Sequence, residues 1–89
     1  MVEVQQAVKA ASDYLRSLYE AENVRDIRLE EVVYDDRVDD FVVPQAVIRS
    51  PRARWLVTLS FERFPDREYK QFEILADTGE VRAMRIVKV

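Results

Sequence analysis

The chain of 89 residues contains no cysteine and no histidine, and it has only one glycine and three prolines. Without cysteine it has no disulfide, thiolate nucleophile or thiolate zinc ligand, and without histidine it has no imidazole base, metal ligand or pH switch. Catalytic triads and dyads built on histidine are therefore excluded. The sequence predicts no catalytic residue, no cofactor and no metal site, and we expect a protein that is not an enzyme.

The composition is that of a packed globular domain, because hydrophobic residues make up 48% and charged residues 35% of the chain. A chain of this length has room for one core, so residues 1–89 are predicted to form a single domain. No apolar run approaches the roughly 20 residues that cross a bilayer. The chain also begins with an acid where a signal peptide would carry lysines, so we expect a cytoplasmic protein without membrane association.

The net charge of −3 conceals two halves of opposite sign. Residues 1–45 hold 11 acids and 5 bases, a charge of −6, and residues 46–89 hold 6 acids and 9 bases, a charge of +3. Either the halves meet in the fold or a basic surface faces an anionic partner. The isoelectric point near 5.0 is unlike that of most nucleic-acid-binding domains. We therefore favour neutralisation within the fold and do not expect nucleic acid as a partner.

Residues 2–22 are predicted to form a helix, because apolar residues recur there every three or four positions. The resulting stripe consists of Val4, Ala7 or Val8, Ala11, Leu15, Leu18 and Tyr19. Asn23 is expected to end the helix, since asparagine tolerates the left-handed conformation. Two ion pairs at i,i+4 spacing are expected on the solvent face, Lys9 with Asp13 and Arg16 with Glu20.

About four strands are expected after the helix, over residues 27–35, 53–64, 69–76 and 81–87. The second has the clearest alternation and places its large apolar residues on one face: Trp55, Val57, Leu59 and Phe61. A phase change at Val32–Val33 indicates a bulge in the first strand, and Gly79 supplies positive φ for the last hairpin, whose register stays open. The fold class is α+β, with one N-terminal helix packed on an antiparallel sheet.

Residues 37–52 are long for a hairpin loop in a compact domain, and they are unusually apolar. We expect either two strand extensions hinged at Pro44 or a segment that packs on a partner. The residues predicted to form an interface are Phe41, Val42, Val43, Val47 and Ile48.

Three further motifs contain residue types that can carry chemistry. Asp77-Thr78-Gly79 matches the short motif of aspartic proteases, but Asp, Thr and Gly are also ordinary hairpin residues and a turn is expected here. The acids at 35–36 and 39–40 lack the spacing of a calcium loop and indicate a solvated acidic loop. Arginines gathered near Trp55 could hold an anion, and the candidates are Arg49, Arg52, Arg54 and Arg82.

The C-terminal half resembles the PepSY domain in three features: Trp55-x-Val57, the strand from Tyr69 to Ala76, and the hairpin that runs from Ile74 through Asp77-Thr78-Gly79-Glu80 to Val81. The resemblance implies a cystatin-like fold, a helix cradled by an antiparallel sheet. It also implies a regulatory role of the kind found in protease propeptides and inhibition.

These observations lead to one functional expectation and one alternative. We expect a small protein-interaction or regulatory module that binds a protein partner or associates with itself as a homodimer or larger homo-oligomer. The alternative is a domain that binds a small ligand or anion through the arginine cluster.

Overall fold

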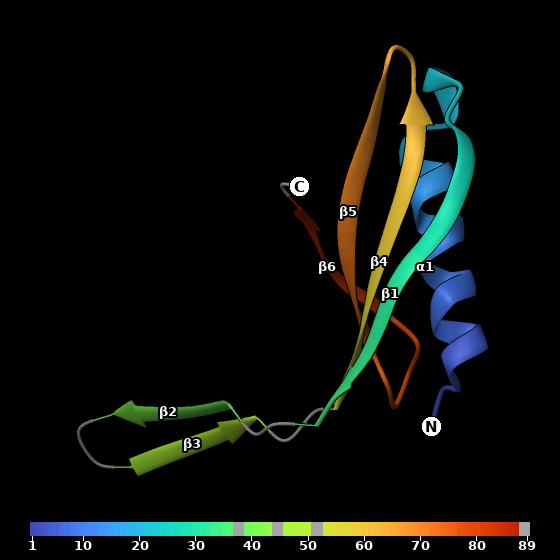
Figure 1. Ribbon diagram of the computed structural model, residues 1–89. Helices are drawn as coiled ribbons and strands as arrows, with labels where there is room; N and C mark the ends of the chain where they lie inside the picture. The colour runs from blue at the N-terminus through green and yellow to red at the C-terminus, as the bar shows by residue number, and fades with distance from the viewer. Residues whose placement is uncertain (37–38, 44–45, 51–52, 88–89) are drawn as a thin grey trace.

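The computed structural model describes residues 1–36, 39–43, 46–50 and 53–87, and for 39–43 and 46–50 it describes the backbone alone. The elements are a helix, a short 3-10 turn and six strands: α1 (Val4–Leu18), η1 (Glu20–Glu22), β1 (Arg25–Asp35), β2 (Asp39–Val43), β3 (Ala46–Ser50), β4 (Arg54–Arg63), β5 (Asp66–Leu75) and β6 (Val81–Ile86). Four strands form an antiparallel sheet in the order β1-β4-β5-β6, with α1 against one face (Figure 1). The predicted α+β fold is confirmed.

The helix is shorter than the predicted span of residues 2–22. It begins after Glu3, whose backbone N–H donates to Oε1 of Gln6 at 2.9 Å. The chain then tightens into η1 after Leu18, and Asn23 closes this turn with φ of 51°, the left-handed conformation expected of it.

This early end changes one of the two predicted ion pairs on the helix. Lys9 and Asp13 form the expected pair, with Nζ and Oδ2 2.6 Å apart. The pairing of Arg16 with Glu20 is wrong: Arg16 lies 3.7 Å from Asp13 instead. Glu20 already belongs to the 3-10 turn, so it does not lie one α-helical turn beyond Arg16.

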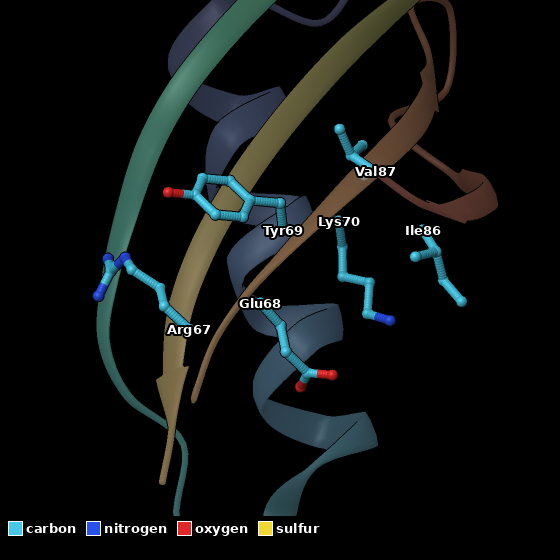
Figure 2. A pocket seen from close by; sticks show the side chains of 6 residues that line it. All are labelled: Arg67, Glu68, Tyr69, Lys70, Ile86 and Val87. Carbon is cyan, nitrogen blue, oxygen red and sulfur yellow. The ribbon is translucent and has the colours of Figure 1, made fainter. Parts of the chain in front are cut away.

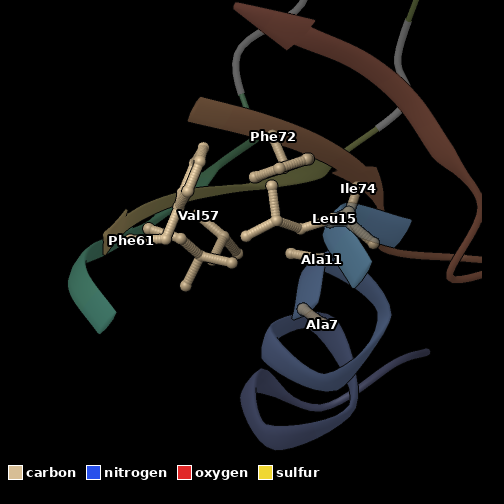
Figure 3. Packing of buried hydrophobic residues seen from close by; sticks show 8 residues of the cluster. Ala7, Ala11, Leu15, Val57, Phe61, Phe72 and Ile74 are labelled. Carbon is tan, nitrogen blue, oxygen red and sulfur yellow. The ribbon is translucent and has the colours of Figure 1, made fainter. Parts of the chain in front are cut away.

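The core lies between the middle of α1 and the strands β4 and β5 (Figure 3). Small side chains on the helix allow it to approach the sheet, and the larger ones come mainly from the strands. The fully buried members are Ala7, Ala11 and Leu15 on the helix, Val57, Leu59 and Phe61 on β4, and Phe72 and Ile74 on β5. The predicted stripe is therefore correct in its centre, whereas Val4 and Leu18 at its ends are exposed.

Three register shifts interrupt the pairing of the large sheet, and the sequence indicates only part of them. The bulge expected in β1 is present, but it lies between Leu29 and Glu31, two residues before the predicted phase change. A second shift in β1 lies between Arg25 and Arg28. The third lies between Glu73 and Ile74 of β5 and sets the pairing with β6 that the sequence leaves open. Gly79 has the expected positive φ, 77°, and a Cβ there would lie 3.1 Å from Cγ2 of Val2.

Strands β2 and β3 form a separate two-stranded sheet, the β2–β3 hairpin, which projects from the end of β1 and β4 (Figure 1). The last partners of β1 and β4 are Asp35 and Arg54, and the first partners of the hairpin are Asp39 and Ser50. Each strand advances by the same four residues, so the hairpin keeps the register of β1 and β4. The expected strand extensions are confirmed, and Pro44 lies outside the described residues.

The core makes a direct prediction about α1. Replacing Leu15, which is 0% exposed, by alanine leaves a cavity against β4 and β5 and should lower the free energy of unfolding by about 2–5 kcal/mol. Leu18→Ala is the matched control, because Leu18 is 50% exposed and should change stability by about 0.5 kcal/mol. Urea denaturation of both variants checks this, and equal losses would contradict the packing.

Candidate functional site

The five predicted interface residues all lie on the β2–β3 hairpin, where the backbone places most of them opposite one another. Phe41 pairs with Ile48, Val42 with Val47, and Val43 with Ala46. Within the described part of the chain no third strand joins this sheet. Each of its two strands therefore has an outer edge of backbone N–H and C=O groups without a strand neighbour, which is the kind of edge that can pair with another chain.

The second candidate is an arginine cluster around Glu73, on the sheet face opposite α1. Glu73 stands between Phe72 and Ile74, which point into the core, so its side chain takes the open face. Its side chain is 3% exposed. Arg54 Nη1 donates to Glu73 Oε1 at 2.7 Å and Arg85 Nη2 donates to Oε2 at 3.2 Å.

Two more groups complete this cluster. Arg82 Nη1 lies 3.9 Å from Oε1 of Glu73, and Nε of Arg54 donates to Asp35 Oδ2 at 3.1 Å. The structure thus brings together two of the four predicted anion-binding arginines, Arg54 and Arg82. The side chain of Arg49 is not described, and Arg52 lies outside the described residues.

The cluster determines the ionisation of Glu73. Burial alone would raise the pKa of this carboxyl group, but hydrogen bonds from Arg54 and Arg85 and the charges of Arg54 and Arg82 outweigh burial and hold the pKa below its ordinary value of 4.5. Glu73 is therefore an anion at neutral pH that already occupies the position where an external anion would meet these arginines.

Arg85 is the member of this cluster that the sequence did not indicate. It reaches Glu73 because β6 pairs with β5 such that Gln71 faces Arg85 and Glu73 faces Ala83. That register depends on the shift beside Glu73, for which the sequence carries no clear signal. Alternation along β5 does predict that Glu73 lies on the open face of the sheet. An acid in the middle of a strand there needs basic neighbours, and this was the one signal in the sequence that pointed toward Arg85.

A cavity of about 390 Å³ lies where β6 ends beside β5, and Figure 2 shows the six side chains that line it. Glu68 and Lys70 point to one side of β5, while Arg67 and Tyr69 point to the other. Arg67 is held by Ser60 and by Asp26, and Glu68 is 3.3 Å from Arg63. These polar groups do not converge on one point, so the cavity lacks the arrangement of a catalytic or ligand site.

A shallower groove of about 590 Å³ follows residues 1–5 beside Trp55. Trp55 is partly buried and fixed there, because its Nε1 donates to the carbonyl oxygen of Val2 at 3.0 Å and its ring meets Tyr34 edge-on at 4.9 Å. It therefore serves as packing at the edge of the core, as the alternation of β4 predicts, and not as part of the arginine cluster.

The oppositely charged halves of the chain meet through β1 and its neighbours. Among the described residues, ion pairs that cross between them join Arg54 to Asp35 at 3.1 Å, Arg63 to Glu22 at 3.3 Å, and Arg67 to Asp26 at 3.1 Å. Neutralisation within the fold, the preferred explanation of the charge distribution, is present in the structure.

The described residues contain no candidate metal site and no candidate membrane span. Over residues 1–36 and 53–87 no group of three acidic residues is placed to hold a metal ion. Among the described helices none has the length and hydropathy to span a bilayer.

No protein-family model, curated protein or solved structure matches this chain.

The arginine cluster predicts a specific pH dependence of stability. Glu73→Gln should lower the free energy of unfolding at pH 7 by about 2–4 kcal/mol, because the largely buried Arg54 loses one of its counter-charges. Since the folded pKa of Glu73 is lowered, its contribution is complete above the ordinary value of 4.5 and is lost as the pH falls toward the folded pKa. The deficit of the variant should therefore shrink between pH 5 and about pH 3 in urea titrations.

Glu62→Gln provides the control for this prediction. Glu62 is an exposed acid on the same face of the sheet, in β4, and its loss should change stability by about 0.5 kcal/mol or less. A deficit for Glu73→Gln that stays constant down to pH 3 would contradict the proposed ionisation of Glu73.

Proposed function

We propose that this chain is a non-enzymatic protein-interaction domain that binds another protein chain through the β2–β3 hairpin. The observation that supports it is the position of this hairpin. It projects beyond the sheet that α1 covers (Figure 1), and three of its five residue pairs, Phe41–Ile48, Val42–Val47 and Val43–Ala46, are apolar.

The physical argument begins with the stability of such a hairpin. Two strands in isolation are marginally stable in water, and three strands or packing against another element are usually needed. No third strand accompanies β2 and β3 in the described chain. A strand or apolar surface from another protein would supply the missing neighbour, the mode of recognition called strand addition.

The same proposal includes the regulatory role implied by the resemblance to the PepSY domain. That role requires binding to a protein, and the fold has a helix on an antiparallel sheet as the resemblance implies. It also includes the cytoplasmic location expected from the sequence.

The alternative, an anion-binding domain, is less well supported by the geometry. Arg54 donates to both Glu73 and Asp35, and Arg82 and Arg85 share Glu73. An anion would have to displace carboxylates from these arginines, so we assign the cluster to the stability of the open face.

A hairpin deletion tests the proposal. Because Asp35 pairs with Arg54, Asp36 and Ala53 would be the next partners, and an Asn-Gly turn can replace residues 37–52 between them. Light scattering and co-purification from the native cells should show that the intact protein associates and that the deletion variant does not. Its thermal midpoint should stay close to that of the intact protein, because the core residues are untouched.

Phe64→Ser is the matched control, because Phe64 is exposed at the far end of the β4–β5 hairpin and is large and apolar. It should leave association unchanged. If the deletion variant keeps its partner or its own oligomer, the hairpin is not the binding element.

A further inference from the structure

We propose that the chain bound by the β2–β3 hairpin is a second copy of this protein, and that two copies exchange halves at the connection between Val43 and Ala46. In the exchanged dimer β2 of one copy pairs with β3 of the other. This inference rests on the proposed function, since it names the partner of the same hairpin.

The first argument is the shared register. Asp35 pairs with Arg54 at the end of the large sheet and Asp39 with Ser50 at the start of the hairpin, four residues further along each strand, and the hairpin pairing ends with Val43 opposite Ala46. If each chain continues in an extended conformation beyond Val43, β2 of one copy forms with β3 of the other copy the same residue pairs that it forms within one chain. The two strands then run antiparallel about a two-fold axis at the connection, which gives a closed, isologous dimer.

The second argument is the chemistry of that connection. A two-residue link between paired strands strongly favours type I′ or II′ turns, and both need positive φ at the first residue. Here the first residue is Pro44, and the proline ring fixes φ near −65°. The second is Gln45, where type I′ turns favour glycine. The sequence therefore disfavours closing this hairpin within one chain, and short, unfavourable hinges invite exchange.

The third argument is that exchange keeps every described contact between the part of the chain up to Val43 and the part from Ala46 onward. Helix α1 and β1 belong to the first half, and their partners β4 and β5 belong to the second. The ion pairs of Arg54, Arg63 and Arg67 also cross between the halves. All of these form equally well when the halves come from different copies.

The fourth argument concerns the hairpin itself. In one copy, β2 and β3 form a two-stranded ribbon that no other described strand joins (Figure 1). Exchange joins two such ribbons end to end, so the combined ribbon is anchored by a helix–sheet unit at both ends. This arrangement replaces a marginal two-stranded hairpin by a longer ladder with no tight turn.

Engineered disulfides test the exchange, because the chain has no cysteine of its own. Asp40 and Arg49 are partners in the hairpin, so in the double variant Asp40→Cys/Arg49→Cys an exchanged dimer forms disulfides between chains. Nonreducing electrophoresis after oxidation should then show a dimer band that disappears on reduction. Thr58→Cys/Gln71→Cys is the control, since both residues lie in the second half and should give a band of one chain.

A second pair of substitutions tests the connection directly. Pro44→Asn together with Gln45→Gly supplies the residues of a type I′ turn and should favour the closed hairpin. We expect the dissociation constant of the dimer, measured by light scattering over a dilution series, to rise by at least about tenfold, equivalent to about 1.4 kcal/mol.

The outcomes separate this inference from the proposed function. A protein that dimerises while Asp40→Cys/Arg49→Cys gives only bands of one chain would overturn the exchange and leave the hairpin as the binding element. A protein that is monomeric at every concentration would also overturn it. Association that survives deletion of residues 37–52 would instead remove the proposed function itself.

Discussion

The antiparallel pairing of β1 with β4 is the constraint on which the rest of the structure depends. It joins the acidic first half of the chain to the basic second half, and the ion pairs between these halves lie along or beside it. It also fixes where β2 and β3 emerge, because they continue the same register beyond Asp35 and Arg54. A shift of one residue would turn Val57 and Phe61 away from the helix, so burial of the core fixes the register of β1 and β4.

Only one face of the sheet is covered by a helix, and the other face is organised around a charge. Glu73 is nearly buried there without an apolar layer above it. Removing a carboxylate from water is costly unless basic groups replace the lost hydration, and arginines from β4 and β6 supply this. Glu73 therefore links three neighbouring strands on the open face, as Leu15 links the helix to β4 and β5 on the covered face.

Local patterns in the sequence were sufficient for most of the fold. The three-four spacing around Ala7, Ala11 and Leu15 identified the helix face, and alternation identified β4. The predictions that were wrong or missing concern contacts set by where one element ends or how two strands are aligned. Arg16 pairs with Asp13 because the helix ends early, and Arg85 joins Glu73 because of a register shift that has no sequence marker. Of the candidate site, the sequence supplied the apolar hairpin and two arginines but not the carboxylate that unites those arginines.

At Pro44 and Gln45 the residue types conflict with the strand pairing on either side of them. At Asn23 and Gly79 the residue type suits the backbone, since both have positive φ, and such agreement between levels is typical of natural sequences. Between Val43 and Ala46 the ladder requires a tight connection, whereas proline and glutamine are poor residues for one. Conflicts of this kind concentrate at functional positions. In the proposed exchange the same residue pairs form between two chains, and the tight connection is no longer required.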